Sequence, residues 1–197
     1  LRLLDTIEGD YMLHFMTSHP KDATHKLIDV MAKGKHIAKH FHLPMQAGSD
    51  KVLRVMNRRY TFEKYISIVD YIREKMPDAV ITSDIMVGFP DESEEDFEDT
   101  LSALRRAEFD MIYSFIYSPR KGTPAAEMEF PENEVALARA EMIETIQSRI
   151  MDDYSQAMLG TVVEVVVDGY DEEFEQFYGR TYADSPDIDG RVWIASE

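Results

Sequence analysis

The sequence contains no cysteine in its 197 residues. This absence excludes disulfide bonds, and it excludes thiolate metal sites built from these residues. The sequence also lacks any apolar run near the roughly 20 residues that a membrane-spanning helix requires. The chain starts at Leu1 in the middle of a pattern, without an initiator methionine or a signal-like segment. We therefore expect a soluble, cytoplasmic protein that binds no membrane, and a piece of a longer chain.

Positive charge is scarce, and the net charge is −17. The imbalance is uneven, because residues 1–60 carry a net +4, residues 61–159 carry −13 and residues 160–197 carry −8. Most of the chain should therefore repel a phosphate backbone, while its first segment should not. The hydrophobic content of 44%, with 11% aromatic residues, is sufficient for a globular core.

Four apolar runs have the length and composition of β-strands, and helical patterns follow or separate them. They cover residues 11–16, 37–43, 79–89 and 111–117. Strands that alternate with helices predict a parallel α/β sheet or barrel.

Two of the predicted helices have clear start signals. Thr61 is a suitable N-cap for a helix that extends to Lys75. Ser93, with Asp96 three residues later, resembles a capping box at the start of the next helix. Both signals favour helices that lie between the predicted strands.

A longer helix is predicted from Glu132 to about Met158, with an apolar or aromatic residue at every fourth position from Ala138. Gly160 should end it, and the segments beyond alternate in the manner of β-strands. We therefore expect a domain boundary near Gly160. The predicted domains are residues 1–159, an α/β part, and residues 160–197, the start of a small β domain.

In a parallel α/β fold, ligands bind at the carboxyl ends of the strands. Small, polar and proline residues follow each predicted strand, in residues 17–20, 44–49, 88–90 and 118–124. An ordinary turn explains each segment taken alone. Because all four should meet at one edge, together they favour a binding site there.

Three polar residues interrupt the third predicted strand: Thr82, Ser83 and Asp84. A polar side chain inside a strand must be hydrogen-bonded or solvated in a cavity. A role in a site is one explanation. The other is structural, with Asp84 capping a loop or pairing with a buried arginine, and the sequence leaves both open.

All six histidines lie within the first 42 residues, and His40 and His42 could face the same side of a strand. Without a third ligand at a recognisable spacing, solvated or core histidines are favoured over a metal site. The basic residues that follow could meet phosphates, although solvated side chains are the usual explanation. These candidates are Lys51, Arg54, Arg58 and Arg59.

Four segments together resemble one known family. They read FMTSHP, HLPMQAGSDKVLRVMNRRYT, TSDIMVGFPDESEEDFEDTL and FIYSPRKGTPAAEM. In this order they are similar to the radical S-adenosylmethionine (SAM) methylthiotransferases, and most closely to the branch that forms 2-methylthio-N6-isopentenyladenosine in tRNA. The resemblance covers nearly all of residues 1–160.

The resemblance implies a particular fold and set of cofactors. The chain would be the C-terminal part of a radical SAM partial (βα)6 barrel, similar to a TIM barrel, followed by the start of a TRAM domain. The family uses S-adenosylmethionine and two 4Fe-4S clusters. Because this sequence has no cysteine, the cluster ligands would lie before Leu1, and these residues alone would be inactive.

The resemblance also implies the chemistry. A reduced cluster cleaves S-adenosylmethionine to methionine and a 5′-deoxyadenosyl radical, which abstracts hydrogen from an unactivated C–H bond. Sulfur from the second cluster and a methyl group from a second S-adenosylmethionine are then installed. The protein holds the cofactor and excludes water.

Residues of the matching segments at the strand ends are then expected to line the cofactor cavity. These residues are Gln46, Gly48, Ser49, Ser83, Asp84, Gly88, Ser118 and Arg120. The short basic helix with Lys51, Arg54, Arg58 and Arg59 is expected to face tRNA.

The implied substrate has an alternative. The segment GRTYADSPDIDG resembles the related enzymes that methylthiolate an aspartate of a small-subunit ribosomal protein. The −8 charge of residues 160–197 agrees with a basic protein partner. The longer match favours tRNA. A third reading is a non-catalytic module whose acidic β end binds a basic partner.

Overall fold

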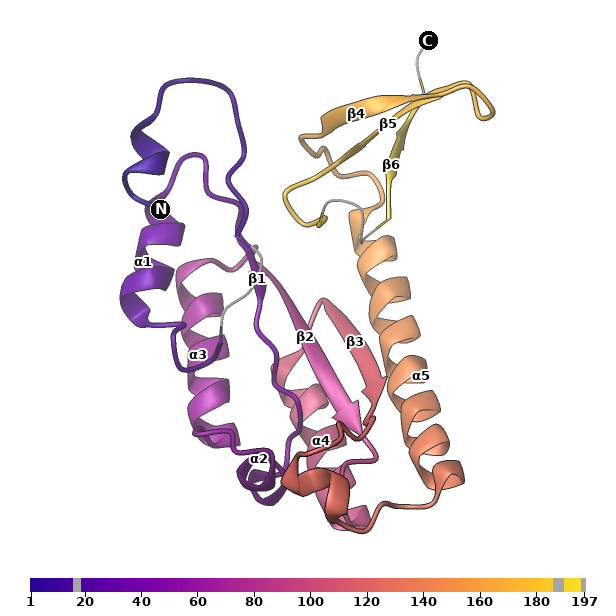
Figure 1. Ribbon diagram of the computed structural model, residues 1–197. Helices are drawn as coiled ribbons and strands as arrows, with labels where there is room; N and C mark the ends of the chain where they lie inside the picture. The colour runs from indigo at the N-terminus through magenta and orange to yellow at the C-terminus, as the bar shows by residue number, and fades with distance from the viewer. Residues whose placement is uncertain (16–18, 186–189, 196–197) are drawn as a thin grey trace.

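The computed structural model describes residues 1–15, 19–185 and 190–195. The elements run in the order η1 (Leu4–Thr6), α1 (His25–Lys33), β1 (His40–His42), α2 (Asp50–Val55), α3 (Phe62–Lys75), β2 (Val80–Val87), α4 (Glu94–Ala107), β3 (Met111–Ile116), η2 (Pro124–Glu127), α5 (Asn133–Met158), β4 (Val166–Asp171), β5 (Gln176–Arg180) and β6 (Val192–Ile194). Figure 1 shows a helix-rich body and a smaller β-sheet joined by the long α5.

The body contains a parallel sheet in the order β1-β2-β3. These strands confirm three of the four predicted runs. The first run is wrong as a regular strand, because its described part forms a single parallel bridge, from Leu13 to Ile37. Met16, the last residue of that run, lies outside the described residues. Backbone hydrogen bonds to His36 and Ala38 hold Leu13 beside the chain that leads into β1.

The two faces of the sheet differ, because side chains alternate along each strand. On one face Phe41, Ile81 and Ile85 are fully buried, and they belong to the same core as residues of α3 and α4. The other face carries Thr82 and Asp84 of β2. The polar residues noted in this strand therefore divide between the faces, with Ser83 alone on the helix side.

Both predicted caps are present. The Thr61 hydroxyl accepts the Lys64 N–H at the start of α3, and a full capping box joins Ser93 and Asp96 at the start of α4. These signals act within four residues, so they can be predicted without knowing the rest of the fold.

The predicted length of α5 is confirmed, but the fourfold spacing from Ala138 does not mark its buried face. Ala136, Arg139 and Ile143 are buried, whereas Met142 is 46% exposed. A helix has 3.6 residues per turn, so a stripe repeated every four residues drifts around its surface. The side of α5 that packs on the body therefore lies beside the predicted stripe at this end.

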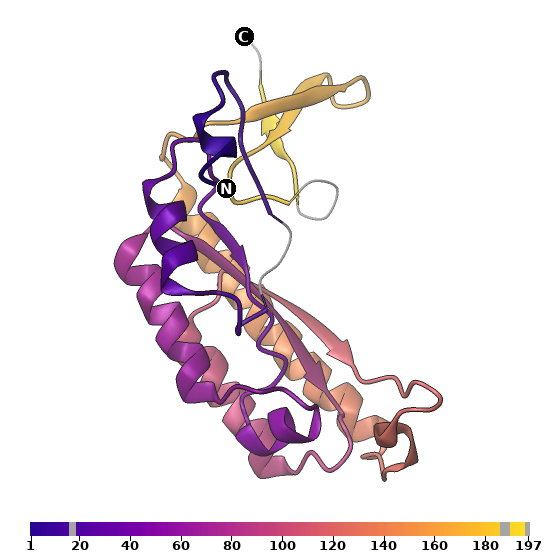
Figure 2. The ribbon, with the colours of Figure 1, turned by 60° about the vertical axis from the view of Figure 1, so that its left-hand side comes forward.

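The C-terminal sheet is antiparallel, in the order β4-β5-β6. Gly160 adopts φ +77° just after α5, a conformation that suits glycine. The Tyr182 hydroxyl donates to the Asp78 carbonyl at 2.9 Å, which connects the segment after β5 with the loop before β2. Figure 2 shows the small sheet at the end of the body where the N-terminal residues also lie.

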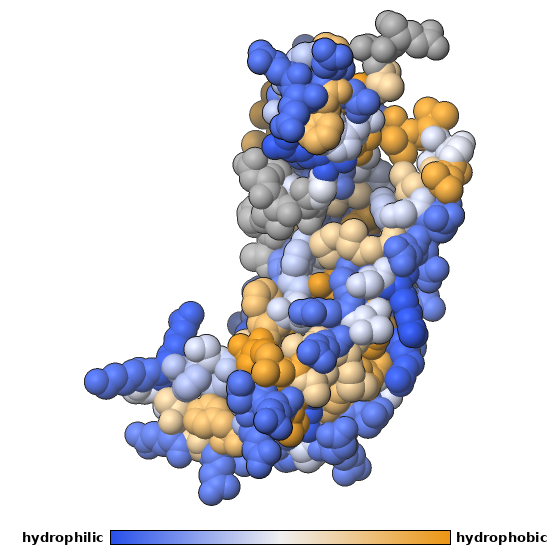
Figure 3. All heavy atoms as spheres, turned by 90° about the vertical axis from the view of Figure 1, so that its right-hand side faces the viewer, coloured by the Kyte–Doolittle hydropathy of each residue, from blue (hydrophilic) through white to orange (hydrophobic). Residues whose placement is uncertain are grey.

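The surface carries both hydrophilic and apolar residues. The side shown in Figure 3 is largely hydrophilic, with apolar patches between charged residues. Exposed apolar side chains of α5 include Leu137, Met142 and Met151. Within the described parts of the chain, α5 included, we find no helix with the length and apolar character that crossing a membrane requires.

Asp96 connects the starts of α2 and α4. Its carboxylate accepts hydrogen bonds from Lys51 Nζ, Ser49 Oγ and Ser93 Oγ, each at 2.6 Å. Burial acts to raise the pKa of Asp96, but the hydrogen bonds from Lys51, Ser49 and Ser93 outweigh it and hold this pKa well below its usual range. The charged carboxylate therefore stabilises the fold.

We expect Asp96→Asn to lower the free energy of unfolding by about 1–3 kcal/mol at pH 7, because a charged acceptor is lost. The folded-state pKa is depressed, so this contribution is present above about pH 4 and is lost as the pH falls further. Urea unfolding at pH 7 and pH 3 measures both effects, and the difference between the variant and the wild type should shrink at pH 3.

Asp99→Asn is the matched control, since Asp99 lies exposed on the same helix. An equal loss of stability in both variants at pH 7 would contradict the role given to Asp96.

Candidate functional site

Three buried hydroxyl groups hold the end of β1. Tyr65 Oη and Ser83 Oγ donate to the Leu43 carbonyl at 2.6 and 3.1 Å, and Ser83 Oγ accepts the Met45 N–H at 2.9 Å. Tyr60 Oη donates to the Met45 carbonyl at 3.0 Å. Burial raises the pKa of Tyr60 to about 12, so its hydroxyl remains a donor at neutral pH. These three hydroxyl groups, which we call the hydroxyl clamp, thereby fix the backbone after β1.

Gln46 follows this clamp in an unusual conformation. His42 pairs with Thr82, but Gln46 pairs with Ile85, so the β1 side carries one residue more than the β2 side between these pairs. Gln46 accommodates the extra residue with φ 71°, the left-handed region that non-glycine residues rarely occupy. Such local strain is frequent at functional sites.

The Gln46 side chain is largely buried at the edge of the sheet. The residue is 7% exposed, and its amide forms no hydrogen bond with any residue in the described part of the chain. Its backbone is nevertheless fully engaged, because its N–H donates to the Asp84 carbonyl and its carbonyl accepts the Met86 N–H, both at 2.8 Å. A rigid backbone thus carries an amide with free donors and acceptors.

Gly88 begins the turn after β2 with φ +70°. A Cβ at this position would lie 2.8 Å from Ala136 Cβ of α5, so a larger residue would collide with the helix. Its N–H donates to Glu92 Oε2 at 2.8 Å. The close approach of α5 and the positive φ therefore both favour glycine at this position.

Glu92 and Arg139 form a buried ion pair, with Nη1 to Oε2 at 2.7 Å and side-chain exposures of 0% and 6%. Arg139 also donates to the Glu92 carbonyl and to Glu94, and it lies over the Phe97 ring. Burial raises the pKa of Glu92, while the Gly88 N–H and Arg139 limit the rise. The pair fastens the N-terminal half of α5 to the turn after β2.

The end of β3 is aromatic. The Tyr117 N–H donates to the Val87 carbonyl, so Tyr117 lies beside the end of β2. Its ring packs edge-on against Phe89, with centroids 4.7 Å apart, and stacks on Phe130 at 6.0 Å. Ser118 and Arg120 follow on an exposed connection.

A polar row lies on the sheet face turned away from α3 and α4. His42 Nδ1 is 2.9 Å and His40 Nε2 is 3.4 Å from Thr82 Oγ1, and His42 Nε2 is 3.4 Å from Asp84 Oδ1. Asp84 therefore faces a histidine rather than the buried arginine considered for it. No group of three or more potential metal-ligating side chains occurs among residues 1–15, 19–185 and 190–195.

The residues predicted to bind the cofactor lie at the carboxyl edge of the sheet, but only some of them are direct neighbours. Gln46 and Asp84 are adjacent through their backbones, and Gly88 follows on the next turn. Ser83 belongs to the hydroxyl clamp on the helix side. Ser118 and Arg120 form no hydrogen bond with these residues within the described parts of the chain. Of the first predicted segment, residues 17 and 18 lie outside the described residues.

Gly48 and Ser49 have structural contacts that account for their identity. A Cβ on Gly48 would lie 2.6 Å from Asp99 O and Thr100 Cα of α4, and the Gly48 N–H donates to Thr100 Oγ1 at 3.0 Å. Ser49 caps α2 and donates to Asp96. Whether either also meets a cofactor stays a prediction.

The four basic residues predicted to bind nucleic acid differ in whether other residues of the chain already bind them. Lys51 is held by Asp96 and by the Asp91 carbonyl, the latter at 2.9 Å. Arg54, Arg58 and Arg59 form no ion pair with any described residue. These three arginines are the cations of this segment that remain open to a partner.

Several residues that shape the site were not identified from the sequence. They are Tyr60, Tyr65, Glu92 and Arg139. Arg139 carried a usable signal, because it lies between Ala136 and Ile143 on the apolar face of a regular helix. A charge on such a face requires a buried partner.

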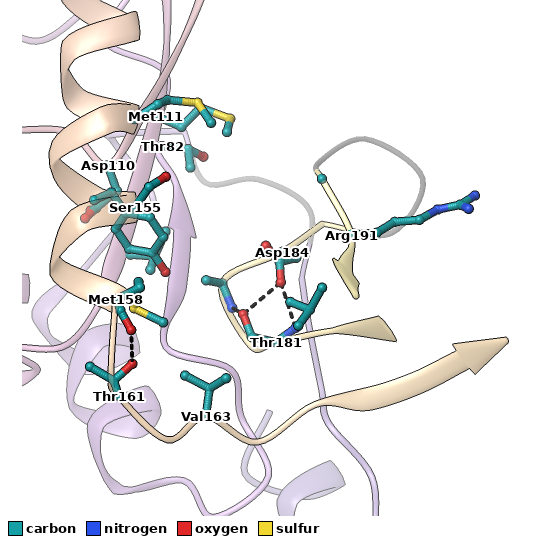
Figure 4. Close-up of a pocket in the computed structure, with 16 residues that line it drawn as sticks. Thr82, Asp110, Met111, Ser155, Met158, Thr161, Val163, Thr181, Asp184 and Arg191 are labelled. Carbon is teal, nitrogen blue, oxygen red and sulfur yellow. Dashed lines mark hydrogen bonds between the residues drawn. The ribbon is translucent and has the colours of Figure 1, made fainter. Parts of the chain in front are cut away.

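A pocket of about 470 Å³ lies at the other end of the strands (Figure 4). Its walls come from the starts of β2 and β3, the last part of α5, and the C-terminal sheet, and include Val80, Met111, Tyr154 and Val192. It opens at the amino ends, where parallel α/β folds rarely place their chemistry. The candidate site is therefore the carboxyl edge.

Comparisons with known proteins identify the family. The model of the radical SAM superfamily matches residues 1–104, just over half of the chain, and the TRAM domain model matches residues 159–197. The expected fold class, a radical SAM partial barrel followed by TRAM, is thereby confirmed.

The chain is also similar to curated relatives called tRNA-2-methylthio-N(6)-dimethylallyladenosine synthase. It is 46% identical to that of Caldicellulosiruptor saccharolyticus over 183 residues, which cover 92% of this chain and 39% of the relative. It is 46% identical to that of Thermodesulfovibrio yellowstonii over 174 residues, which cover 88% and 40%. The chain spans about two fifths of the length of these relatives.

A solved structure shares the fold. Coproporphyrinogen III oxidase of Escherichia coli, described as a radical SAM enzyme, superposes with a TM-score of 0.58 over 71% of this chain and 32% of its own length. The sequence identity is 17%, so this likeness concerns the fold alone.

The Glu92–Arg139 pair can be tested by a double-mutant cycle. We expect Arg139→Met alone to lower the free energy of unfolding by about 3–5 kcal/mol, because it leaves the buried Glu92 carboxylate unpaired. Glu92→Leu alone should cost less, because Arg139 keeps its contact with Glu94. The double variant should lose far less, since both charges are removed together. Urea unfolding of the four proteins gives the coupling energy, and additive losses would contradict the buried pair.

Proposed function

Because this chain belongs to the radical SAM superfamily, we propose that it is part of a methylthiotransferase that acts on tRNA. Its substrate position would be C2 of N6-isopentenyladenosine next to the anticodon, where sulfur and a methyl group are inserted. The observation that carries the proposal is the similarity, over 92% of the chain, to a relative called tRNA-2-methylthio-N(6)-dimethylallyladenosine synthase. The two domains would be residues 1–159 and 160–197.

The carboxyl edge fits S-adenosylmethionine. The cofactor has an adenine, a ribose and an amino-acid part, and each needs donors and acceptors in a shaped pocket. Gln46 offers a free amide on a fixed backbone, and Asp84 offers a partly exposed carboxylate. The Cβ side of Gly88 is filled by Ala136 of α5, so this glycine would contribute by shaping the turn beside the cofactor. When bound, S-adenosylmethionine would supply the radical and the methyl group; these residues would orient it.

The chain does not supply the iron–sulfur ligands. With no cysteine in the sequence, thiolates for two 4Fe-4S clusters must come from outside these residues. The role of this chain is therefore to bind and position S-adenosylmethionine and the RNA, and these 197 residues alone should be inactive.

The charge distribution supports an RNA substrate at the carboxyl edge. Arg54, Arg58 and Arg59 lie after the β1 end, and Arg120 lies after the β3 end, on a chain with a net charge of −17. Phosphates are attracted to the unpaired cations and repelled by the acidic remainder. This division would direct RNA to the edge where the cofactor binds. Such a protein would work in the cytoplasm with its tRNA.

A ribosomal-protein substrate is the alternative that one observation favours. Residues 160–197 carry −8, with only Arg180 and Arg191 as basic residues. Arg180 is already paired with Asp168 at 2.5 Å. An acidic sheet suits a basic protein segment, either as substrate or, in a non-catalytic module, as a docking partner.

The substrate can be decided directly. The whole protein with reconstituted clusters is incubated with S-adenosylmethionine and either isopentenylated tRNA or small ribosomal subunits. We expect a mass increase of one methylthio group in the tRNA, with tRNA that lacks the isopentenyl group as the control. Modification of the ribosomal protein alone would contradict the proposal.

Gln46→Ala in the whole protein should weaken S-adenosylmethionine binding about tenfold, because one or two hydrogen bonds are lost. Isothermal titration measures the affinity, and Gln156→Ala is the matched control because Gln156 is exposed on α5. Unchanged affinity and turnover in Gln46→Ala would remove this residue from the site, and the same test applies to Asp84→Ala.

A further inference from the structure

The sheet face turned away from α3 and α4 changes from polar to apolar toward the carboxyl ends of its strands. The His42 and Tyr113 rings meet on this face, with centroids 5.8 Å apart. Because side chains alternate along a strand, three neighbouring pairs of β2 and β3 share it, namely Thr82–Met111, Asp84–Tyr113 and Met86–Phe115. Of these three, the pair nearest the carboxyl edge is the one with two apolar side chains.

The two ends of this face differ in what covers them. At the amino ends, Thr82 and Met111 line the pocket whose other walls are α5 and the C-terminal sheet (Figure 4). At the carboxyl ends, Phe115 is 51% exposed, and neither Phe115 nor Met86 is among the described residues that line the pocket. Parallel sheets are normally covered on both faces. The exposed phenyl ring therefore indicates a surface that another group covers.

The apolar pair adjoins the candidate cofactor site. The Met86 N–H donates to the Gln46 carbonyl at 2.8 Å, and Asp84 precedes Met86 on the same face of β2. A group that rests on Met86 and Phe115 would thus lie next to a cofactor held by Gln46 and Asp84. Reacting atoms must come within about 3–3.5 Å of each other, so the substrate has to bind directly beside the cofactor. The group that covers this surface is then part of the substrate.

The apolar character of the pair indicates which part of the substrate it binds. Phosphates, riboses and base edges are polar, whereas the isopentenyl group of the proposed substrate is a branched hydrocarbon chain. Such a group is stabilised when it is buried against apolar side chains, and the flexible Met86 can adapt to its shape. The aspartate of the alternative protein substrate carries a carboxylate, which an apolar surface does not favour.

We propose that Phe115, with Met86 beside it, binds the isopentenyl group of the substrate adenosine and thereby selects isopentenylated RNA. This inference rests on the proposed function and names the residues that recognise the modification already present on the substrate. The other possible occupant is a segment of the whole protein outside these residues. In that case Phe115 would affect the binding of every RNA alike, which the test distinguishes.

The test uses the whole protein and two synthetic anticodon stem-loops, one with N6-isopentenyladenosine and one with adenosine at the same position. Fluorescence anisotropy gives the ratio of the two affinities. We expect the wild-type protein to bind the isopentenylated RNA about tenfold more tightly, and Phe115→Ala to bind both RNAs nearly equally. Phe115→Leu should keep most of the preference, because leucine retains an apolar surface.

Phe177→Ala is the matched control, since Phe177 is 41% exposed on β5 of the C-terminal sheet. This variant should keep the wild-type ratio of affinities. The ratio also separates recognition from misfolding, because a poorly folded variant loses affinity for both RNAs by the same factor. A wild-type ratio in Phe115→Ala, with or without an equal loss of affinity for both RNAs, would overturn the inference.

Failure of this inference differs from failure of the proposed function. If the wild-type protein methylthiolates the isopentenylated RNA but Phe115→Ala keeps the wild-type ratio, the inference is wrong and the function stands. The same holds if the wild-type protein modifies this RNA but binds both RNAs equally. If the wild-type protein neither binds nor modifies either RNA, the proposed function is wrong, and the inference with it.

Discussion

The clamp on the end of β1 is the constraint on which the candidate site depends. Tyr65 and Ser83 share the Leu43 carbonyl, and Tyr60 holds the next turn through the Met45 carbonyl. Buried hydroxyls must be satisfied, so these bonds fix the backbone in one arrangement. The left-handed conformation of Gln46 is then imposed by its neighbours. Gln46 therefore lies at the edge of the sheet in a strained conformation, with a side-chain amide that has no partner among the described residues.

The second support of the edge is the ion pair between Glu92 and Arg139. It draws α5 against the turn after β2 and leaves Gly88 with its N–H directed to a carboxylate. Replacing a buried ion pair of this kind with two well-packed apolar residues is often neutral or stabilising. What it supplies here is a defined position for the turn, which a cofactor site requires.

Local chemistry made much of this fold predictable. The caps at Thr61 and Ser93, the length of α5 and three of the four strands follow from signals within a few residues. The meeting of strand ends at one edge follows from parallel pairing. Two features could not be predicted in the same way. The extra residue between His42 and Gln46 depends on the pairing register with β2. The Arg139–Glu92 bond joins residues that are 47 apart in sequence. Lys51 shows the same limit, since its partner Asp96 is 45 residues away.

The most direct test of this account is a crystal structure of the whole protein with S-adenosylmethionine bound. The account predicts the cofactor at the carboxyl ends of β1 and β2, within hydrogen-bond distance of the Gln46 amide and close to Gly88. Cofactor density in the pocket at the amino ends, beside Met111 and Tyr154, would contradict it.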